Sequence, residues 1–194
     1  MLRLAYVAAL AVAFTISLPQ SAHADRVTPP PVPSNINVAA GKKAFLEGHA
    51  IGTQDYICLP SGAGFAWTFF GPQATLFDGP DKQVATHFLS PNPAESGTRR
   101  ATWQHSKDTS TVWAVATASS SDPAFVAPGA IPWLLLQVVG AHEGSTGGDK
   151  LSGATFIHRL NTFGGVAPST GCTVSTDVGK RALVPYTADY FFYR

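Results

Sequence analysis

The sequence predicts an all-β fold, a single-domain antiparallel β-sandwich or barrel with one disulfide. Short segments rich in aromatic and β-branched residues recur along the chain and end at Gly, Pro, Ser or Asp. Within one of them, apolar Phe65, Trp67 and Phe69 alternate with Ala66 and Thr68, which gives a strongly apolar face. No segment after the N-terminal leader has the periodicity of an amphipathic helix. Many short strands with regular turn signals are typical of sandwiches and closed barrels.

Residues 1–24 are predicted to be a secretory signal peptide. Arg3 gives a positive start, Leu4–Leu18 is apolar, and Ala22-His23-Ala24 has the small-x-small pattern of a cleavage site. The apolar run is shorter than the roughly 20 residues that span a bilayer, although an uncleaved N-terminal anchor is the alternative. After cleavage we expect a secreted or periplasmic protein with no membrane span.

Residues 25–37 are predicted to be a proline-rich linker, and residues 38–194 the β domain. Four prolines between Asp25 and Ser34 favour extended, poorly packed backbone. A segment docked on the edge of the domain is the alternative. The 157 residues or so that remain are enough for one domain with a real hydrophobic core.

The composition argues against a nucleic-acid partner. Charged residues make up only 13% of the chain, and the formal net charge is +1. Polyanion binding needs clustered Lys and Arg, but the adjacent basic residues are three isolated pairs: Lys42-Lys43, Arg99-Arg100 and Lys180-Arg181. We expect a surface rich in uncharged polar residues and a partner that is a small molecule, a carbohydrate or an envelope component.

The two cysteines, Cys58 and Cys172, are predicted to form a disulfide because an even count is typical of exported proteins. Such a bond would tie the first third of the domain to its end. Two buried free thiols or a metal pair are the alternatives, although two cysteines without a CxxC motif make a poor zinc site.

The expected strands follow one another along the whole domain. They are residues 43–47, 54–59, 65–70, 74–77, 83–89, 100–105, 111–117, 133–139, 154–160, 172–176, 182–185 and 189–193. Residues 140–165 contain two histidines and two Gly-Gly pairs. Because strands are expected on both sides, this stretch is interpreted as a hairpin loop, with a ligand loop using His142, Glu143 or Asp149 as the alternative.

No catalytic motif or cofactor fingerprint is present, so no cofactor is expected. Gly62-Ala63-Gly64 lacks the third glycine of a dinucleotide loop and precedes an aromatic strand. Among the histidines, His87 is the best functional candidate because it ends a strand ahead of a loop. His105 and His142 are expected on loop surfaces, and His158 within a strand.

The tryptophans are expected mostly in the core, since a β core and a sugar-binding face need the same residues. Trp103 is predicted to be partly exposed because it lies beside the longest polar loops. The candidate ligand-binding residues are therefore His87, Trp103 and His142, and the binding surface is expected on the loops around them. The sequence does not decide whether any of the three binds metal.

Several segments, taken in order, resemble one secreted family, catalogued as domain of unknown function 3455. The matching segments are Ala50-x-Gly52-x-Gln54-x-Tyr56-x-Cys58, His87-Phe88, Trp103, Asp108-x-Ser110-x-Val112, Pro132-Trp133-Leu134-Leu135-Leu136, Arg159-x-x-Thr162-x-Gly164-Gly165-x-Ala167-Pro168-x-x-x-Cys172 and Pro185-Tyr186-x-Ala188-x-Tyr190-Phe191-x-Tyr193. The resemblance implies export, a β-rich domain and pairing of the two cysteines, but no reaction.

The chain departs from the family pattern at two places. Residues 90–102 separate His87 from Trp103, which stand close together in the family. The usual Asp-Gly-Ser turn reads Asp108-Thr109-Ser110 here. A site built on either loop is expected to differ in this protein.

These features together predict an exported, non-catalytic β domain that binds a ligand or an envelope component. The alternative is a metal-assisted extracytoplasmic enzyme that uses His87 with His142, Glu143 or His158.

Overall fold

A computed structural model describes residues 27–79 and 82–194. The predicted signal peptide lies outside the described residues. Within them, the chain has no helix that is both long and apolar enough to cross a bilayer.

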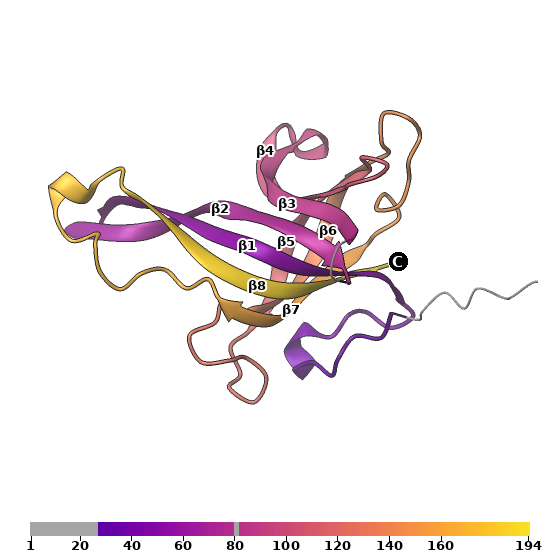
Figure 1. Cartoon of the computed structure of the whole chain (residues 1–194), viewed down its shortest axis with the longest axis horizontal. Helices are drawn as coiled ribbons and strands as arrows, with labels where there is room; N and C mark the ends of the chain where they lie inside the picture. Colours follow the sequence, from indigo (N-terminus) through magenta and orange to yellow (C-terminus); the bar gives the residue numbers. More distant parts are fainter. Residues whose placement is uncertain (1–26, 80–81) are drawn as a thin grey trace, which may run out of the picture.

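The eight described strands form a closed antiparallel barrel in which each strand pairs with its neighbours in sequence (Figure 1). The barrel closes because β1 also pairs with β8, with His49 opposite Asp189. An all-β sandwich or barrel with one disulfide was predicted; the all-β class and the disulfide are confirmed, and the architecture is the barrel. The strands are β1 (Ala44–Ser61), β2 (Gly64–Asp78), β3 (Lys82–Asn92), β4 (Thr98–His105), β5 (Thr111–Ser120), β6 (Trp133–His142), β7 (Phe156–Gly164) and β8 (Arg181–Tyr193).

Twelve strands were expected, and the difference comes from strand length and from one wrong assignment. Three pairs of expected segments are each one continuous strand, namely β1, β2 and β8. The predicted strand at residues 172–176 is wrong, because the chain there turns into the 3-10 helix η3 (Ser175–Asp177). The Asp177 carboxylate accepts hydrogen bonds from the backbone N–H groups of Thr173 and Val174. A side chain that bonds nearby backbone groups in this way competes with strand pairing.

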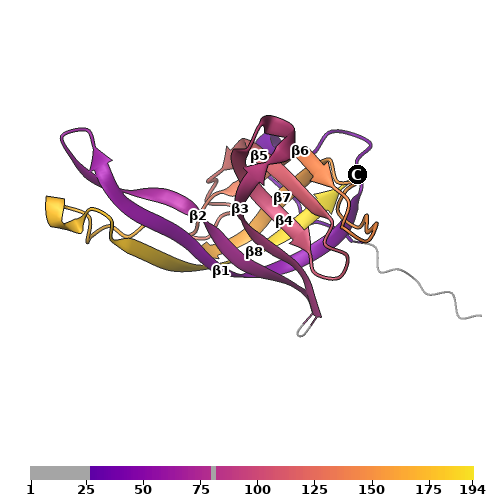
Figure 2. The same ribbon diagram turned by 90° about the horizontal axis from the view of Figure 1, so that it is seen from above.

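A three-stranded arm projects beyond the barrel (Figures 1 and 2). It consists of residues 55–71 of β1 and β2, together with residues 171–185, because β2 pairs with β3 only from Ala74 onwards and β8 pairs with β7 only from Tyr186 onwards. The Cys58–Cys172 disulfide, with Cα atoms 5.5 Å apart, links the segment before β8 to β1 within the arm.

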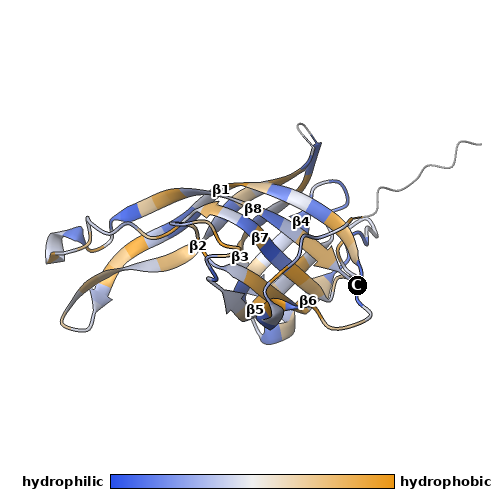
Figure 3. Cartoon of the chain, turned by 90° about the horizontal axis from the view of Figure 1, so that it is seen from below, coloured by the Kyte–Doolittle hydropathy of each residue, from blue (hydrophilic) through white to orange (hydrophobic). Residues whose placement is uncertain are grey.

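The first of two apolar cores fills part of the barrel interior. Hydrophobic and hydrophilic positions alternate along the strands, as Figure 3 shows, because successive side chains of a strand point to opposite faces. Inward positions carry large apolar side chains such as Leu76, Trp103, Ile157 and Phe192, all fully buried.

The second core lies on the outer wall, where the N-terminal segment covers β6, β7 and β8. Ile36, in the 3-10 helix η1 (Ser34–Ile36), is fully buried against Trp133, Leu160 and Phe191. The backbone carbonyl of Ile36 lies 2.7 Å from His158 Nε2. In its described part, from residue 27, the segment expected to be a free linker is therefore docked on the barrel, because its apolar residues complete this outer core.

Candidate functional site

A cavity of about 250 Å³ lies inside the barrel, and all eight strands contribute to its wall. Its lining includes Phe69, with 47% of its surface exposed, and Arg99, which is also exposed. These two residues mark the side on which the cavity meets solvent, near the base of the arm. Ligand pockets commonly measure about 300–1,000 Å³, so this cavity suits a small molecule.

Aromatic rings form one wall of the cavity. His87 on β3 and Trp103 on β4 are cross-strand partners, and their rings stack with centroids 4.1 Å apart and planes 7° apart. Tyr190 on β8 packs edge-on against both rings. The expected partial exposure of Trp103 is wrong, since it has no exposed surface, and His87 lies within β3 and is buried rather than at a strand end. Both side chains point into the barrel.

The residues that separate His87 from Trp103 in sequence do not separate them in space. They extend β3 and β4 into a longer hairpin with the 3-10 helix η2 (Pro93–Glu95) at its tip. The tip is held by Arg100, whose guanidinium donates two hydrogen bonds to the Glu95 carboxylate at 2.8 and 2.7 Å. Because Arg99 and Ala101 from this hairpin also line the cavity, the extra residues add to its wall.

Three buried hydrogen-bond donors of the cavity wall make no well-formed hydrogen bond among the described residues. They are Gln54 Nε2, Trp103 Nε1 and Arg159 Nε. The side chains of Gln54 and Arg159 do lie close to the hydroxyls of Tyr186 and Tyr190, and they lower the pKa of these two tyrosines against the larger effect of burial. Leaving a buried donor unpaired costs roughly 1–3 kcal/mol, more when it is charged. A set of three around one cavity is therefore a site that a bound acceptor would complete.

Arg159 brings a positive charge to the cavity without a described acidic partner. Its Nη2 donates to the backbone carbonyl of Pro132 at 2.9 Å, and no ion pair among the described residues includes it. The charge acts on its neighbours: burial raises the pKa of Tyr190 and of Tyr56, and the Arg159 charge partly offsets both shifts. A guanidinium that has no acidic partner and lies beside an enclosed space favours an anionic ligand.

His87 is held neutral at physiological pH. Burial lowers its pKa to about 3, and the Arg159 charge acts in the same direction. His87 Nδ1 lies 2.9 Å from the Thr102 carbonyl oxygen, which can only accept a hydrogen bond. The proton therefore sits on Nδ1, and Nε2 is left as an acceptor. The cavity thus combines the positive charge of Arg159 with neutral polar groups. Exposed Arg99 also contributes to its lining, as does Arg100, which is paired with Glu95.

His142 does not join His87 and Trp103 in the cavity. It lies exposed at the end of β6, where its ring packs edge-on against Trp113. His105, expected on a loop surface, is instead mostly buried at the end of β4, where its ring pairs with Asp108. The loop that follows His142 joins β6 to β7, as the hairpin interpretation predicted.

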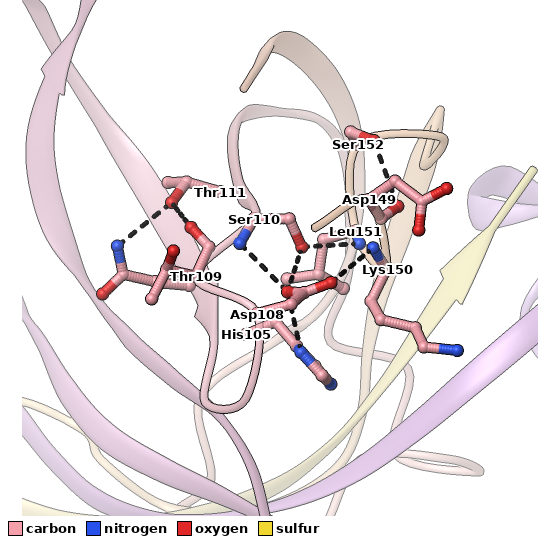
Figure 4. A network of polar contacts seen from close by, with 10 residues as sticks. His105, Asp108, Thr109, Ser110, Thr111, Asp149, Lys150, Leu151 and Ser152 are labelled. Carbon is pink, nitrogen blue, oxygen red and sulfur yellow. Dashed lines mark hydrogen bonds and ion pairs between the residues drawn. The ribbon is translucent and has the colours of Figure 1, made fainter. Parts of the chain in front are cut away.

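The β6–β7 loop is fastened to the β4–β5 turn by a polar network around Asp108 (Figure 4). The Asp108 carboxylate accepts from the Lys150 backbone at 2.9 Å and from the Ser110 backbone and hydroxyl at 3.0 and 2.7 Å. Burial alone would raise the pKa of this carboxyl, but these hydrogen bonds outweigh it and hold the pKa well below its usual range. A side chain on Gly144 would overlap the Asp108 carbonyl oxygen. The network gives this loop a structural role, since it holds the β6–β7 loop against the β4–β5 turn.

The family profile described as protein of unknown function (DUF3455) matches residues 39–194. The chain belongs to this family. No curated protein and no solved structure matches the sequence.

Sequence reasoning missed Gln54 and Arg159 as site residues, although both stand in the segments quoted for the family resemblance. Both are polar residues inside predicted strands, at positions that point inward.

The family turn Asp-Gly-Ser also has a physical explanation. Thr109 adopts a left-handed φ of 60°, a conformation that glycine reaches at no steric cost.

A separate polar cluster lies on the outer wall, at the seam between β1 and β8. Glu47, His49 and Asp189 each offer one potential metal ligand, and these atoms lie within 4.8 Å of one another. It is the one such group of three found among the described residues. None of the histidines of the predicted metal-assisted enzyme belongs to it, and His158 is instead engaged with Tyr193 and Ile36.

Proposed function

We propose that this protein is an exported binding protein that holds a small organic anion with an apolar body inside its barrel. The observation that carries the proposal is the set of unpaired donors on Gln54, Trp103 and Arg159 around one cavity. A carboxylate presents two acceptor oxygens and a negative charge, so it would satisfy the guanidinium of Arg159 and a neighbouring N–H group.

The rest of the wall supports an apolar body for the ligand. Leu89, Leu134 and Leu136 line the cavity beside the stacked rings of His87 and Trp103. Aromatic and aliphatic walls with a few placed polar groups are typical of small-molecule sites. The ligand is thus expected to combine a flat or short apolar part with one carboxylate.

Export is supported by the predicted leader, the low charge and the disulfide. A disulfide is compatible with an oxidising compartment such as the periplasm or the cell exterior. Cell fractionation combined with thiol labelling tests this part. We expect mature protein outside the cytoplasm with both cysteines unreactive, and full-length protein retained in the cytoplasm with reactive thiols would contradict it.

The binding proposal is tested by isothermal titration calorimetry of the mature, oxidised protein. The probes are benzoate, cinnamate and octanoate, each compared with its primary amide, which has the same shape but no charge. We expect at least one carboxylate to bind more tightly than its amide. If none of the carboxylates binds, the proposed ligand class is wrong.

Two variants locate the binding. Arg159→Met removes the charge, and the loss of a charged hydrogen bond worth roughly 1.5–3 kcal/mol should weaken carboxylate binding about 10- to 150-fold. Trp103→Phe keeps an aromatic ring but removes the N–H, and should cost less, about 2- to 10-fold. Arg181→Met, which removes an arginine of the arm outside the cavity lining, is the matched control and should bind normally. Equal binding by Arg159→Met and the control would contradict the site.

A further inference from the structure

The outer-wall cluster of Glu47, His49 and Asp189 has the composition and placement of a metal site that is independent of the cavity. Glu47 and His49 are two residues apart on β1, so both side chains leave the same face of the strand. Asp189 on β8 stands directly opposite His49 in the β1–β8 register. Closure of the barrel therefore brings the three groups together from the two ends of the chain.

The cluster is partly organised before any ion binds. His49 Nδ1 lies 2.6 Å from Asp189 Oδ1, and Asn161 Nδ2 donates to the other oxygen, Oδ2, at 2.7 Å. Asn161 sits in the irregular part of β7, with a φ of 50°, and its amide fixes the orientation of the Asp189 carboxylate. Partners that orient a carboxylate in this way are typical of metal sites. Oδ1 is engaged with His49 Nδ1, so this contact has to open when both side chains bind the ion.

The geometry is close to what a small divalent ion requires. Bonds from zinc to nitrogen or oxygen are about 2.0–2.2 Å, so two ligand atoms of a tetrahedral ion are about 3.4 Å apart. The three ligand atoms lie within 4.8 Å of one another, and the 2.6 Å contact between His49 Nδ1 and Asp189 Oδ1 has to lengthen, so binding requires a side-chain rotation. The exposed His49 side chain has the freedom to make it.

The charge of the surroundings also favours a cation. Asp78 stands near Glu47 and His49, although its carboxylate is paired with Lys82 at 2.6 Å. Two carboxylates and one imidazole form a mixed oxygen and nitrogen ligand set. Imidazole favours zinc and related transition metals over magnesium and calcium.

We propose that Glu47, His49 and Asp189 bind one divalent transition-metal ion of the zinc class, with water in the remaining coordination positions. The site faces solvent on the outer wall, whereas the cavity lies inside the barrel.

Equilibrium dialysis of the mature, oxidised protein against zinc chloride, followed by elemental analysis, measures the stoichiometry and affinity. Cobalt(II) absorption in the visible range reports the ligand set directly. We expect one ion per chain. His49→Gln and Asp189→Asn should each weaken binding at least 10-fold and change the cobalt spectrum. Asn161→Ala should weaken it less, because Asn161 only positions Asp189.

His142→Gln is the matched control, since His142 is also an exposed histidine on a strand but lies outside the cluster. It should bind zinc as the wild type does. Circular dichroism verifies that each variant is folded, and Glu47→Gln serves as the test if either of the other ligand variants is not. Absence of stoichiometric zinc, or full binding by the folded ligand variants, would show that the cluster is a surface ion pair only. The carboxylate titrations with Arg159→Met are unaffected by either outcome.

Discussion

Reduction of the Cys58–Cys172 disulfide is expected to lower the free energy of unfolding by several kcal/mol. The two cysteines are 114 residues apart in sequence, so the bond closes a loop that covers most of the domain. The chain-entropy relation for a loop of this length gives about 4.8 kcal/mol at 25 °C. For a domain of this size, that loss corresponds to a decrease of roughly 10–20 °C in the midpoint of thermal unfolding.

Urea unfolding of the mature protein, followed by far-ultraviolet circular dichroism, measures the difference between the oxidised and reduced forms. The doubly substituted variant Cys58→Ala/Cys172→Ala should resemble the reduced protein, with a further small loss because Cys58 is fully buried. The single variant Cys58→Ala should lose about as much as the double variant, since either change removes the cross-link.

A difference of less than about 1 kcal/mol between oxidised and reduced wild type would refute this reasoning. It would mean that the cross-link does not restrict the unfolded chain, or that native strain cancels the gain. Amide hydrogen exchange then separates the two explanations, because strain relief in the reduced protein would be confined to the arm.

Four further predictions follow from single residues. Asp108→Asn should destabilise the protein by about 1.5–3 kcal/mol in urea at pH 7, because the charged hydrogen bonds to Lys150 of the β6–β7 loop and to Ser110 are weakened. Because folding lowers the pKa of Asp108, this stabilisation is present above the unfolded pKa near 3.8 and is lost as the pH falls further. The free energies of unfolding of the variant and the wild type should therefore converge in acid. A difference that stays constant with pH would contradict the role of the ionised Asp108 carboxylate. Thr109→Gly should stabilise the protein by about 0.5–1 kcal/mol, because removing the backbone strain of a β-branched residue with a left-handed φ outweighs the entropy cost of glycine. A decrease in the free energy of unfolding would show that Thr109 is not strained. Burial lowers the pKa of His87 to about 3, so the stability that its neutral form contributes is full above pH 6.5 and is lost as the pH falls toward 3, by at most about 1.4 kcal/mol per pH unit. In urea unfolding, His87→Gln should reduce the dependence of the free energy of unfolding on pH between 6.5 and 3. An unchanged slope would argue against a neutral buried His87. Ile36→Ala should cost about 2–5 kcal/mol and expose residues 27–38 to limited proteolysis, whereas cleavage at the wild-type rate would show that the segment is not docked.

The fold class was predictable from the sequence because alternation and turn residues are local signals. The lengths of the strands were not. Gly52 suggests the end of a strand, but it lies inside β1. A side chain added there would overlap Ala74 of β2, so the glycine allows the two strands to lie close together. Pro72 and Pro185 also suggest strand ends, yet both lie within long strands. Which neighbour a strand meets is decided by the closed barrel and not by the local sequence.

The candidate site was predictable only in part for the same reason. His87 and Trp103 attract attention as rare residue types, and their cross-strand pairing brings them together. Their burial and the separation from His142 depend on which face of each strand points inward. Arg159 was missed because a charged residue in a strand is usually solvent-facing, and only closure of the barrel turns it toward a cavity.

The arm leaves two sheet edges that the closed barrel otherwise eliminates, one on β2 and one on the first residues of β8. Along β2 the residues before Ala74 have no partner on the β3 side, and such an edge can template the addition of a strand from another molecule. Phe70 is unpaired at an irregularity in the β1–β2 register, and the guanidinium groups of Arg99 and Arg181 lie over its ring. Two positive charges and a distorted register discourage strand addition here. Loss of both arginines would therefore endanger the solubility of the folded protein at high concentration more than its folding.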